Sequence, residues 1–391
     1  MNSTHIILVS DQSAPSFLPA LDSKLKASRA LLVVTPEMAA KKRDKTLESI
    51  LRLNGIKVLR HELSETHDYR VIENGLCDMA AAFEHEIAVG EVYLNLTGGT
   101  KLMALAAQSV ARVHFPEKWR TFYVDLQSNK LVWIEGSAWP AGITPEPQVL
   151  DNAIRIPLYL QGYGFELLSG PPPSPWQVSL DHLVQKLLTD VEQIYRPVSR
   201  LNAIAQHSED SRQLRVDFSN FTFTRKDCEP VIQLFADVGL LSFDDQAVVF
   251  KSTADRSFVK GGWLERYTYQ VVVALQGSLG IRDKGFRVTV REITSDVLNE
   301  IDVCFLYRNR LYVIECKTAR MDGGDRANDT LYKLVNIHSR VGGLGARGML
   351  LSYRQILDSE RKLADALGVR IVHGNDLAHL KREISQWVEG K

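Results

Sequence analysis

Cysteine is scarce in this 391-residue chain, and long apolar stretches are missing from it. The four cysteines, Cys77, Cys228, Cys304 and Cys316, form no C-x-x-C pair, and the histidines show no zinc-type spacing with them. We therefore expect no structural zinc site, and reduced thiols in a cytoplasmic protein. Because no apolar run reaches the ~18 residues of a membrane helix, and no secretory pattern begins the chain, we expect no membrane partner.

A net charge is also missing. The chain has 47 Lys and Arg and 47 Asp and Glu, which argues against a surface built throughout to coat nucleic acid. The charges are unevenly distributed, because residues 251–391 hold 23 Lys and Arg against 17 Asp and Glu. The C-terminal third is thus the better candidate for contact with phosphate. With 45% hydrophobic and 24% charged residues, the composition is that of a globular protein and excludes disorder.

Residues 1–150 alternate between short apolar runs and helical patterns. The expected strands are 5–10, 30–35, 91–96, 120–126 and 130–135, and the expected helices include 37–53, 69–88 and one beginning near Lys101. Apolar runs that end in polar residues are typical of buried parallel strands. Alternation of this kind predicts an α/β domain with a Rossmann-like parallel sheet.

Residues 151–255 form a predicted middle segment. The pattern is helical over 174–207 and 226–239, and a short strand is expected at 246–251. This order resembles a small winged-helix module, although a plain connector is the favoured alternative. In either case we expect the segment to be a linker between the two α/β domains.

Residues 256–391 form a second predicted α/β domain. A helix is expected at 263–275, strands at 285–293, 300–307 and 311–316, and a βαβ-type tail over 325–388. The most informative part is NEIDVCFLYRNRLYVIECKT, residues 299–318. Asp302 lies in one predicted strand and Glu315 and Lys317 in the next. Because side chains alternate along a strand, Glu315 and Lys317 share a face, and the hairpin brings Asp302 near Glu315.

Two carboxylates and one ammonium group suit the hydrolysis of a phosphodiester. Asp302 and Glu315 are expected to hold Mn²⁺ or Mg²⁺, with the backbone carbonyl of Cys316 as a third ligand. Lys317 would position the attacking water and offset charge on the phosphate. Glu265, on the preceding helix, would bind a metal-bound water or complete a second metal site. The alternative is a hairpin with solvated charges, which the strongly apolar flanking residues disfavour.

This constellation looks like the PD-(D/E)XK restriction-endonuclease-like family, and the resemblance covers the whole C-terminal domain. It implies that Asp302, Glu315 and Lys317 occupy the catalytic positions and Glu265 the helical acidic position. The family's proline before the aspartate is Ile301 here. That departure should not affect the metal ligands.

A second motif, NLTGGTKLM at residues 95–103, follows a predicted strand and opens a helix. Two glycines allow a tight turn that brings peptide N–H groups close to an anion, and a helix N-terminus favours negative charge. Thr97, Thr100 and Lys101 add donors. The spacing is neither that of a Walker loop nor G-x-G-x-x-G, which disfavours NTP hydrolysis and dinucleotide redox chemistry. A tight connection capped by Thr97 is the alternative.

The ends of two other predicted strands carry polar residues. Ser10, Asp11 and Gln12 follow the first strand, and Thr35 ends the second. In open α/β sheets, ligands bind beyond the carboxyl ends of the strands. The three strand ends are therefore expected to line one polar pocket.

Both motifs in this order resemble the CRISPR-associated CARF-domain ancillary nucleases, over nearly the whole chain. The resemblance implies a homodimer that binds a cyclic oligoadenylate, most commonly cyclic tetra-adenylate, made by a type III CRISPR complex. Binding would activate a metal-dependent nuclease that cuts single-stranded RNA, DNA or both. The residues that would cradle the ligand are Thr97, Gly98, Gly99, Thr100 and Lys101, with Ser10, Asp11, Gln12 and Thr35 lining the pocket.

Two other functions remain open on sequence grounds. A ligand-responsive transcription regulator would use the winged helix to bind duplex DNA without cleaving it, which leaves Glu315 and Lys317 without a role. A constitutive DNA-repair or restriction nuclease would use the N-terminal domain only as a dimerisation scaffold. Cleavage that ignores the cyclic nucleotide would favour the second of these.

Overall fold

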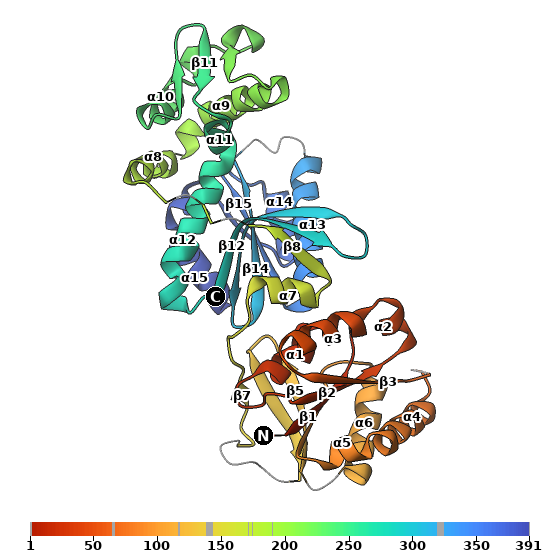
Figure 1. Ribbon diagram of the computed structural model, residues 1–391. Helices are drawn as coiled ribbons and strands as arrows, with labels where there is room; N and C mark the ends of the chain where they lie inside the picture. Colours follow the sequence, from red (N-terminus) through yellow and green to blue (C-terminus); the bar gives the residue numbers. More distant parts are fainter. Residues whose placement is uncertain are drawn as a thin grey trace.

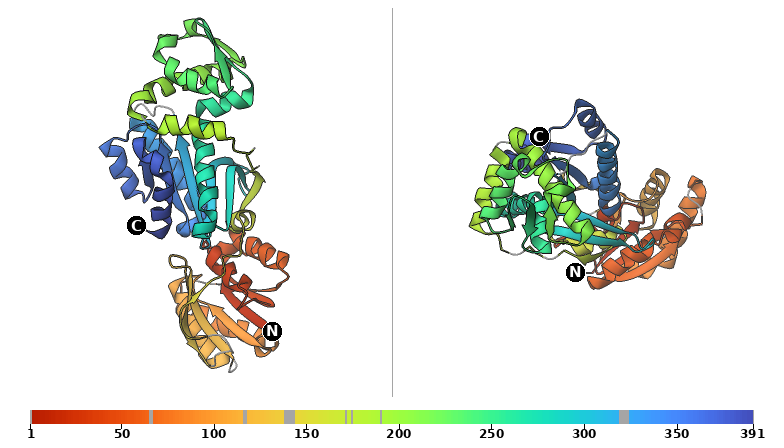
Figure 2. Two further views of the ribbon diagram at one scale, coloured as in Figure 1. Left: turned by 90° about the vertical axis from the view of Figure 1, so that its left-hand side faces the viewer. Right: turned by 90° about the horizontal axis from the view of Figure 1, so that it is seen from above.

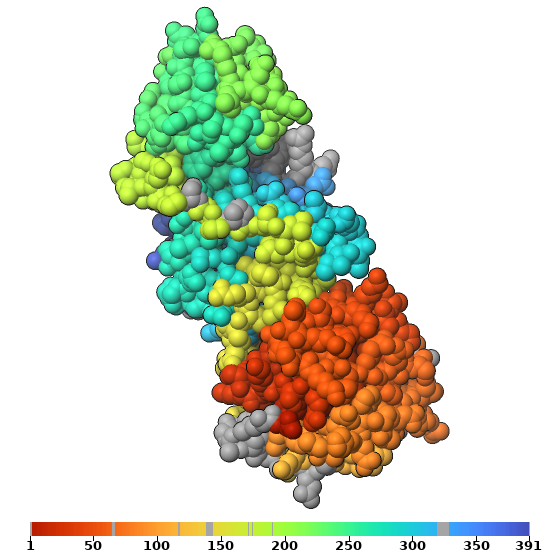
Figure 3. Space-filling view, in the orientation of Figure 1, coloured from red at the N-terminus to blue at the C-terminus, as the bar shows by residue number. Residues whose placement is uncertain are grey.

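The computed structural model describes residues 2–64, 67–115, 118–137, 144–170, 172–173, 175–189, 191–318 and 324–390. Figures 1 and 2 show an elongated molecule of three parts. The N-terminal domain lies at one end, the C-terminal domain in the centre, and a smaller module at the other end. In the space-filling view the N-terminal domain meets the central one along a closed contact (Figure 3).

The N-terminal domain is built on a seven-stranded sheet of order β3-β2-β1-β4-β5-β6-β7. Its strands are β1 (Ser3–Leu8), β2 (Arg29–Val34), β3 (Lys57–Glu62), β4 (Glu91–Asn95), β5 (Trp119–Asp125), β6 (Lys130–Gly136) and β7 (Gln148–Val149). The first five in chain order are parallel, and β6 and β7 run antiparallel to their neighbours. This confirms the predicted Rossmann-like sheet. The sequence did not predict β3, because this edge strand is largely exposed and has no apolar run.

Helices cover both faces of this sheet. They are α1 (Ala14–Leu21), α2 (Pro36–Ala40), α3 (Arg43–Leu53), α4 (Tyr69–Ala82), α5 (Glu84–Ala88) and α6 (Lys101–His114). The helices α1 and α3 pack on the face that carries Ile7 and Leu32, and α4 and α6 pack on the face of Ile6 and Leu31. The predicted helix 37–53 is divided in two, because Lys42 has a φ of 56°.

The C-terminal domain is built on a six-stranded sheet of order β16-β15-β14-β13-β12-β8. The strands are β8 (Phe165–Ser169), β12 (Asp283–Glu292), β13 (Leu298–Tyr307), β14 (Arg310–Lys317), β15 (Arg347–Ser352) and β16 (Arg370–His373). On one face lie α12 (Trp263–Leu279) and α15 (Leu380–Glu389), and on the other α7 (Ile156–Gly162), α13 (Gly324–Gly342) and α14 (Asp358–Ala366). The strands β14, β15 and β16 are parallel to one another, as the predicted βαβ-type tail requires.

The third part is a module of helices with a small antiparallel sheet of order β10-β11-β9. It comprises α8 (Val178–Thr189), α9 (Val191–Ser211), β9 (Arg215–Asp217), α10 (Glu229–Asp237), β10 (Leu241–Phe243), β11 (Ala247–Phe250) and α11 (Thr253–Ser257). The order helix, strand, helix and hairpin is of the winged-helix type. The module lies on the side of the C-terminal domain away from the N-terminal one (Figures 1 and 2).

The structure divides the predicted middle segment, residues 151–255, between two parts of the fold. Its first part is built into the C-terminal domain, because β8 pairs with β12 and α7 packs beneath the same sheet. The winged-helix-type module cannot connect the two domains from its position at the far end. Pairing between strands more than 100 residues apart carries no local sequence signal.

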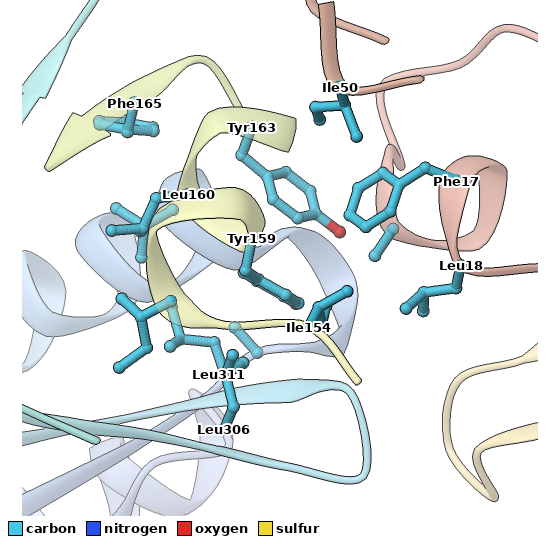
Figure 4. Packing of buried hydrophobic residues seen from close by; sticks show 14 of the residues in the cluster. Phe17, Leu18, Ile50, Ile154, Tyr159, Leu160, Tyr163, Phe165, Leu306 and Leu311 are labelled. Atoms are coloured by element: carbon cyan, nitrogen blue, oxygen red, sulfur yellow. The ribbon is translucent and has the colours of Figure 1, made fainter. Parts of the chain in front are cut away.

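Helix α7 joins the two domains through one continuous apolar core. Figure 4 shows Tyr159 and Tyr163 of α7 between Phe17 of α1 and Leu311 of β14. The Tyr159 hydroxyl donates to the carbonyl of Gly342 over 3.1 Å. The fit is close, since a Cβ atom on Gly162 would lie 2.7 Å from a ring carbon of Phe17. The two domains are thus packed like the interior of a single domain.

The four cysteines are all free thiols, and three of them are buried. Cys316 packs inside the core, with its sulfur 3.6 Å from the hydroxyl of Thr268. Within the described ranges, no helix combines the length and the apolar character that crossing a bilayer requires.

We expect Phe17→Ala to lower the free energy of unfolding by about 3–5 kcal/mol, because the fully buried ring would leave a cavity between α1 and α7. Urea unfolding of the full chain measures this change. Leu53→Ala is the control, because Leu53 ends α3 with 71% of its surface exposed and should change stability by less than about 0.5 kcal/mol. Equal effects of the two substitutions would contradict the interdomain core.

Candidate catalytic and ligand-binding sites

The hairpin of β13 and β14 places the predicted catalytic residues together. Val303 pairs with Ile314, so the next position brings Asp302 beside Glu315. The backbone N–H of Cys316 donates to Asp302 Oδ2 over 2.7 Å, and Lys317 Nζ lies 2.6 Å from Glu315 Oε1. Two carboxylates and one ammonium group therefore gather at the end of the sheet, as the strand alternation predicts.

Burial and mutual repulsion make this cluster electrostatically costly. Burial raises the pKa of Asp302 well above its ordinary value, and the negative charges of Glu315 and Glu265 raise it further. Burial acts to lower the pKa of Lys317, but the Glu315 carboxylate outweighs this effect and the pKa is raised. Lys317 is consequently a stable cation beside two acids.

Glu265 lies in the first turn of α12, close enough to Asp302 to raise its pKa. Its Oε2 is 2.6 Å from Nε of Arg287, on β12. The structure therefore places Glu265 at the edge of the cluster, in an ion pair that the sequence analysis missed. No periodic signal connects Arg287 to a helix 22 residues earlier, because the pairing depends on how α12 crosses the sheet.

The donor atoms fit a hard divalent cation. Within the described ranges, no three His, Cys, Asp or Glu side chains are grouped as a complete metal site. Asp302 and Glu315, with the carbonyl of Cys316, supply only oxygens, which Mg²⁺ and Mn²⁺ prefer, and such cations usually keep several waters. The raised pKa of Asp302 is consistent with this role, since a cation would offset the repulsion that raises it.

The N-terminal loops meet at the carboxyl edge of the first sheet. The strands β2, β1 and β4 are adjacent and parallel, so the residues after each strand emerge side by side. A Cβ atom on Gly98 would lie 1.9 Å from the carbonyl oxygen of Leu8 and 3.3 Å from Ser10 Oγ. Gly99 has a φ of 71°. Both glycines are thus required for the close approach of two loops.

Threonine side chains fix the geometry of this edge. Thr100 Oγ1 accepts from the N–H of Met103 over 3.2 Å and caps α6, so Lys101 starts the helix as an exposed residue. Thr97 Oγ1 accepts from the N–H of Val124 over 2.8 Å, which ties β4 to β5. Thr35 caps α2 by accepting from the N–H of Met38 over 3.2 Å. The helix N-termini at this edge favour an anion.

Asp11 lies between two cations that the sequence analysis missed. Its carboxylate oxygens are 2.8 Å from Lys41 Nζ and 3.0 Å from Arg43 Nε. Partial burial acts to raise the pKa of Asp11, but these two partners outweigh it and the pKa is lowered. The run Lys41-Lys42-Arg43 was a visible basic signal, but only the break between α2 and α3 turns it toward the pocket edge.

Gln12 contacts the C-terminal domain. Its Oε1 accepts from the backbone N–H of Leu344 over 3.0 Å, across the contact with the C-terminal domain. The loop that holds Gln12 leads into α1, the helix that packs against α7. The side chain is therefore committed to the domain contact, which the sequence did not predict.

Comparisons with known proteins agree with this architecture. The profile of the Card1 CARF domain matches residues 4–138, and that of the Card1-like endonuclease domain matches residues 252–390. A search of curated protein sequences gives no match.

Three solved structures have related folds. Protein VC1899 from Vibrio cholerae is 24% identical over 99% of this chain and 98% of its own, with a TM-score of 0.84. Can2 from Sulfobacillus thermosulfidooxidans, solved with cyclic tetra-adenylate, is 22% identical over 99% of both chains, with a TM-score of 0.80. A type III CRISPR defence DNA nuclease activated by cyclic oligoadenylate is 20% identical over 90% of this chain and 46% of its own, with a TM-score of 0.52.

The fold and the two sites define a protein class in which a CARF sensor domain is joined to an endonuclease domain. The two profiles together span well over half of the chain. The chain belongs to the Card1-like CARF endonucleases.

We expect Asp302→Asn to stabilise the metal-free protein at pH 8. Because folding raises the pKa of Asp302 above 3.8, the folded state holds the proton more tightly, and stability falls as the pH rises from about 4 through the folded pKa. Asparagine removes this loss, which amounts to about 1.4 kcal/mol for each pKa unit of elevation.

Urea unfolding at pH 4 and pH 8, without divalent cations, measures this difference. Asp329→Asn is the control at an exposed position of α13 and should leave the pH dependence as it is in the wild type. A gain in stability from Asp302→Asn that is the same at both pH values would contradict the argument.

Proposed function

We propose that this protein is a cyclic-oligoadenylate-activated, divalent-metal-dependent endonuclease of type III CRISPR antiviral defence, acting in the cytoplasm. Its substrate would be single-stranded RNA, DNA or both. The observation that carries the proposal is the cluster of Asp302, Glu315 and Lys317, held in the same packed body as the polar edge of the CARF sheet. The family of the chain and the ligand of Can2 support this reading.

The active site is proposed to work as a PD-(D/E)XK nuclease. Asp302 and Glu315, with the Cys316 carbonyl, would hold Mn²⁺ or Mg²⁺, which supplies Lewis-acid stabilisation of the phosphate when bound. Lys317, kept cationic by Glu315, would orient the attacking water and bind a phosphate oxygen. Glu265 would hold a second water at the edge of the cluster. Arg287 then keeps Glu265 in a fixed position.

The activator is proposed to bind across a CARF homodimer. Residues 97–101 present backbone N–H groups and Lys101 to one half of a ring of phosphates, and a two-fold related copy would present the same groups to the other half. Leu105 and Val113 of α6 and Ile134 of β6 are 63%, 75% and 54% exposed. Gln108 of α6 bonds Glu135 of β6, which places these exposed apolar side chains on neighbouring elements as a dimer surface.

The winged-helix-type module supports a second candidate, a regulator that binds duplex DNA in response to the ligand. This candidate gives no role to the buried cluster of Asp302, Glu315 and Lys317, whose repulsion costs stability. The nuclease hypothesis explains this cost, because a bound divalent cation would offset the repulsion between the carboxylates. Binding of duplex DNA without any cleavage would favour the regulator.

Glu315→Gln and Lys317→Met should each reduce cleavage of labelled single-stranded RNA and DNA by about 10²–10⁴-fold, because each removes a group that acts on the reacting phosphate. Cleavage is measured with Mn²⁺ and saturating cyclic tetra-adenylate, and binding of the activator should be unchanged. Lys381→Met, at an exposed position of α15, is the control. Full activity in both site variants would disprove the catalytic assignment.

Lys101→Met should weaken binding of cyclic tetra-adenylate by about tenfold, because it removes one charge-assisted contact with phosphate. Calorimetric titration measures the affinity. Lys118→Met is the matched control, since Lys118 is exposed and precedes β5 at the opposite edge of the sheet. If both variants bind the activator as the wild type does, Lys101 does not contact it.

Gln12→Ala should reduce activation rather than affinity. The substitution removes the 3.0 Å hydrogen bond to Leu344 N, worth about 1 kcal/mol, so the ratio of stimulated to basal cleavage should fall by about fivefold. Cleavage rates with and without cyclic tetra-adenylate give this ratio, and titration gives the affinity. A loss of affinity at unchanged stimulation would instead place Gln12 in the ligand pocket.

A further inference from the structure

A basic pocket lies apart from both sites, at the end of the endonuclease domain that faces the CARF domain. Its volume is about 590 Å³, within the range of small-molecule sites. The residues that matter for its chemistry are Gln127, Arg308, Arg310, Arg347, Arg370 and Trp387. Arg310 starts β14 and Lys317 ends it, so the pocket is separated from the catalytic cluster by about 20 Å of strand.

Positive charge in this pocket is only partly neutralised. Arg370 forms an ion pair with Glu383 at 2.9 Å. Across the part of the chain that the structure describes, no ion pair joins Arg308, Arg310 or Arg347 to a carboxylate. Asp365 and Glu389 also line the pocket, and Arg310 is close enough to Asp125 to help lower the pKa of that carboxyl. The three guanidinium groups therefore have carboxylates nearby but, among the described residues, form no ion pair with them.

Two of the arginines are held in place by backbone carbonyls. Arg310 Nε donates to the carbonyl of Gly345 over 2.9 Å, and Arg347 Nη1 donates to that of Ala346 over 3.1 Å. Burial lowers the pKa of Arg347, and the neighbouring charge of Arg310 lowers it further. Two cations are thus fixed close together and partly out of water. A bound anion would relieve their repulsion.

The third arginine, Arg308, lies in the turn of the β13–β14 hairpin. Arg308 and Asn309 both have positive φ values, 48° and 57°, in the two-residue turn of the β13–β14 hairpin. The fully buried Asn309 donates through Nδ2 to Asn129 Oδ1 over 2.9 Å and to the carbonyl of Asp151 over 2.8 Å. The guanidinium of Arg308 lies over the Tyr307 ring, 5.1 Å from its centroid. Asn309 thus anchors the turn in the CARF domain and fixes the backbone of Arg308, whose side chain is exposed at the pocket.

An aromatic wall completes the pocket. Trp387 of α15 is half-buried and meets Tyr312 edge to face, with 4.8 Å between the ring centroids. Aromatic rings beside arginines are a common setting for a base next to its phosphate.

We propose that this pocket binds a phosphate-bearing anion of nucleotide size, with Arg308, Arg310 and Arg347 on the phosphate oxygens and Trp387 beside the base. The phosphate belongs either to a free nucleotide or to the 5′ end of a nucleic-acid strand. Guanidinium groups bind phosphate oxygens in pairs and remain charged at any physiological pH, so three of them suit a doubly charged terminal phosphate. The site is distinct from the residues proposed for cyclic oligoadenylate and for catalysis.

The test is calorimetric titration of the full chain carrying Glu315→Gln, so that no probe is cleaved, with the CARF site saturated by cyclic tetra-adenylate. The probes are pyrophosphate, ADP, and one hexanucleotide with either a 5′-phosphate or a 5′-hydroxyl. Binding of ADP, and more weakly of pyrophosphate, identifies a free nucleotide as the ligand, because only ADP can also place a base beside Trp387. Binding of only the 5′-phosphorylated hexanucleotide identifies a strand end. In either case Arg308→Gln and Arg347→Gln should each weaken binding about tenfold.

Arg196→Gln, at an exposed position of α9 in the remote module, is the control and should not change binding. Arg347 also holds a backbone carbonyl, so Arg308→Gln decides the matter if Arg347→Gln fails to fold. Among the described residues Arg308 forms no ion pair, and its exposed guanidinium lies over the Tyr307 ring, so its variant should melt at the wild-type Tm. The proposal is overturned if none of the four probes binds, if the two hexanucleotides bind equally and the small anions do not, or if Arg308→Gln binds as the wild type does.

Discussion

The packing of α7 against α1 is the contact on which the arrangement of both sites depends. Tyr159 and Tyr163 fill the space between Phe17 of the CARF domain and Leu311 of the endonuclease sheet, so one apolar core crosses the domain boundary. The loop after β1 therefore rests, through α1 and α7, on the strands that carry the catalytic hairpin. Such an interior resists gradual deformation, so the ligand proposed for the CARF edge would act by favouring one packed arrangement over another.

Helix α13 runs between the two ends of the endonuclease domain. It spans residues 324–342, about 28 Å of helix. In the turn that follows, the N–H of Leu344 donates a hydrogen bond to Gln12 Oε1. The strand β14, which precedes α13 in the chain, ends at Lys317 in the catalytic cluster. The same turn offers carbonyls to Arg310 and Arg347 of the basic pocket. Polar contacts from two sites thus converge on one short turn.

The structure says more about the function of the carboxylate cluster than about that of the winged-helix-type module. Asp302, Glu315 and Glu265 are crowded at a cost that a bound divalent cation would offset, which supports the catalytic role proposed for them. The module lies beyond the endonuclease domain, away from the CARF domain, and cannot transmit the signal between them.

The sequence by itself determined the features that depend on local periodicity. Alternation along β14 put Glu315 and Lys317 on one face, and apolar runs located the strands of the CARF sheet other than β3 and β7. Only the tertiary structure decided which residues meet across long separations. Gln12 contacts Leu344 across 332 positions, Asp11 meets Lys41 and Arg43, and β8 joins a sheet whose other strands begin beyond residue 280. These pairings follow from how whole helices and sheets pack, and no pattern confined to neighbouring residues records that packing.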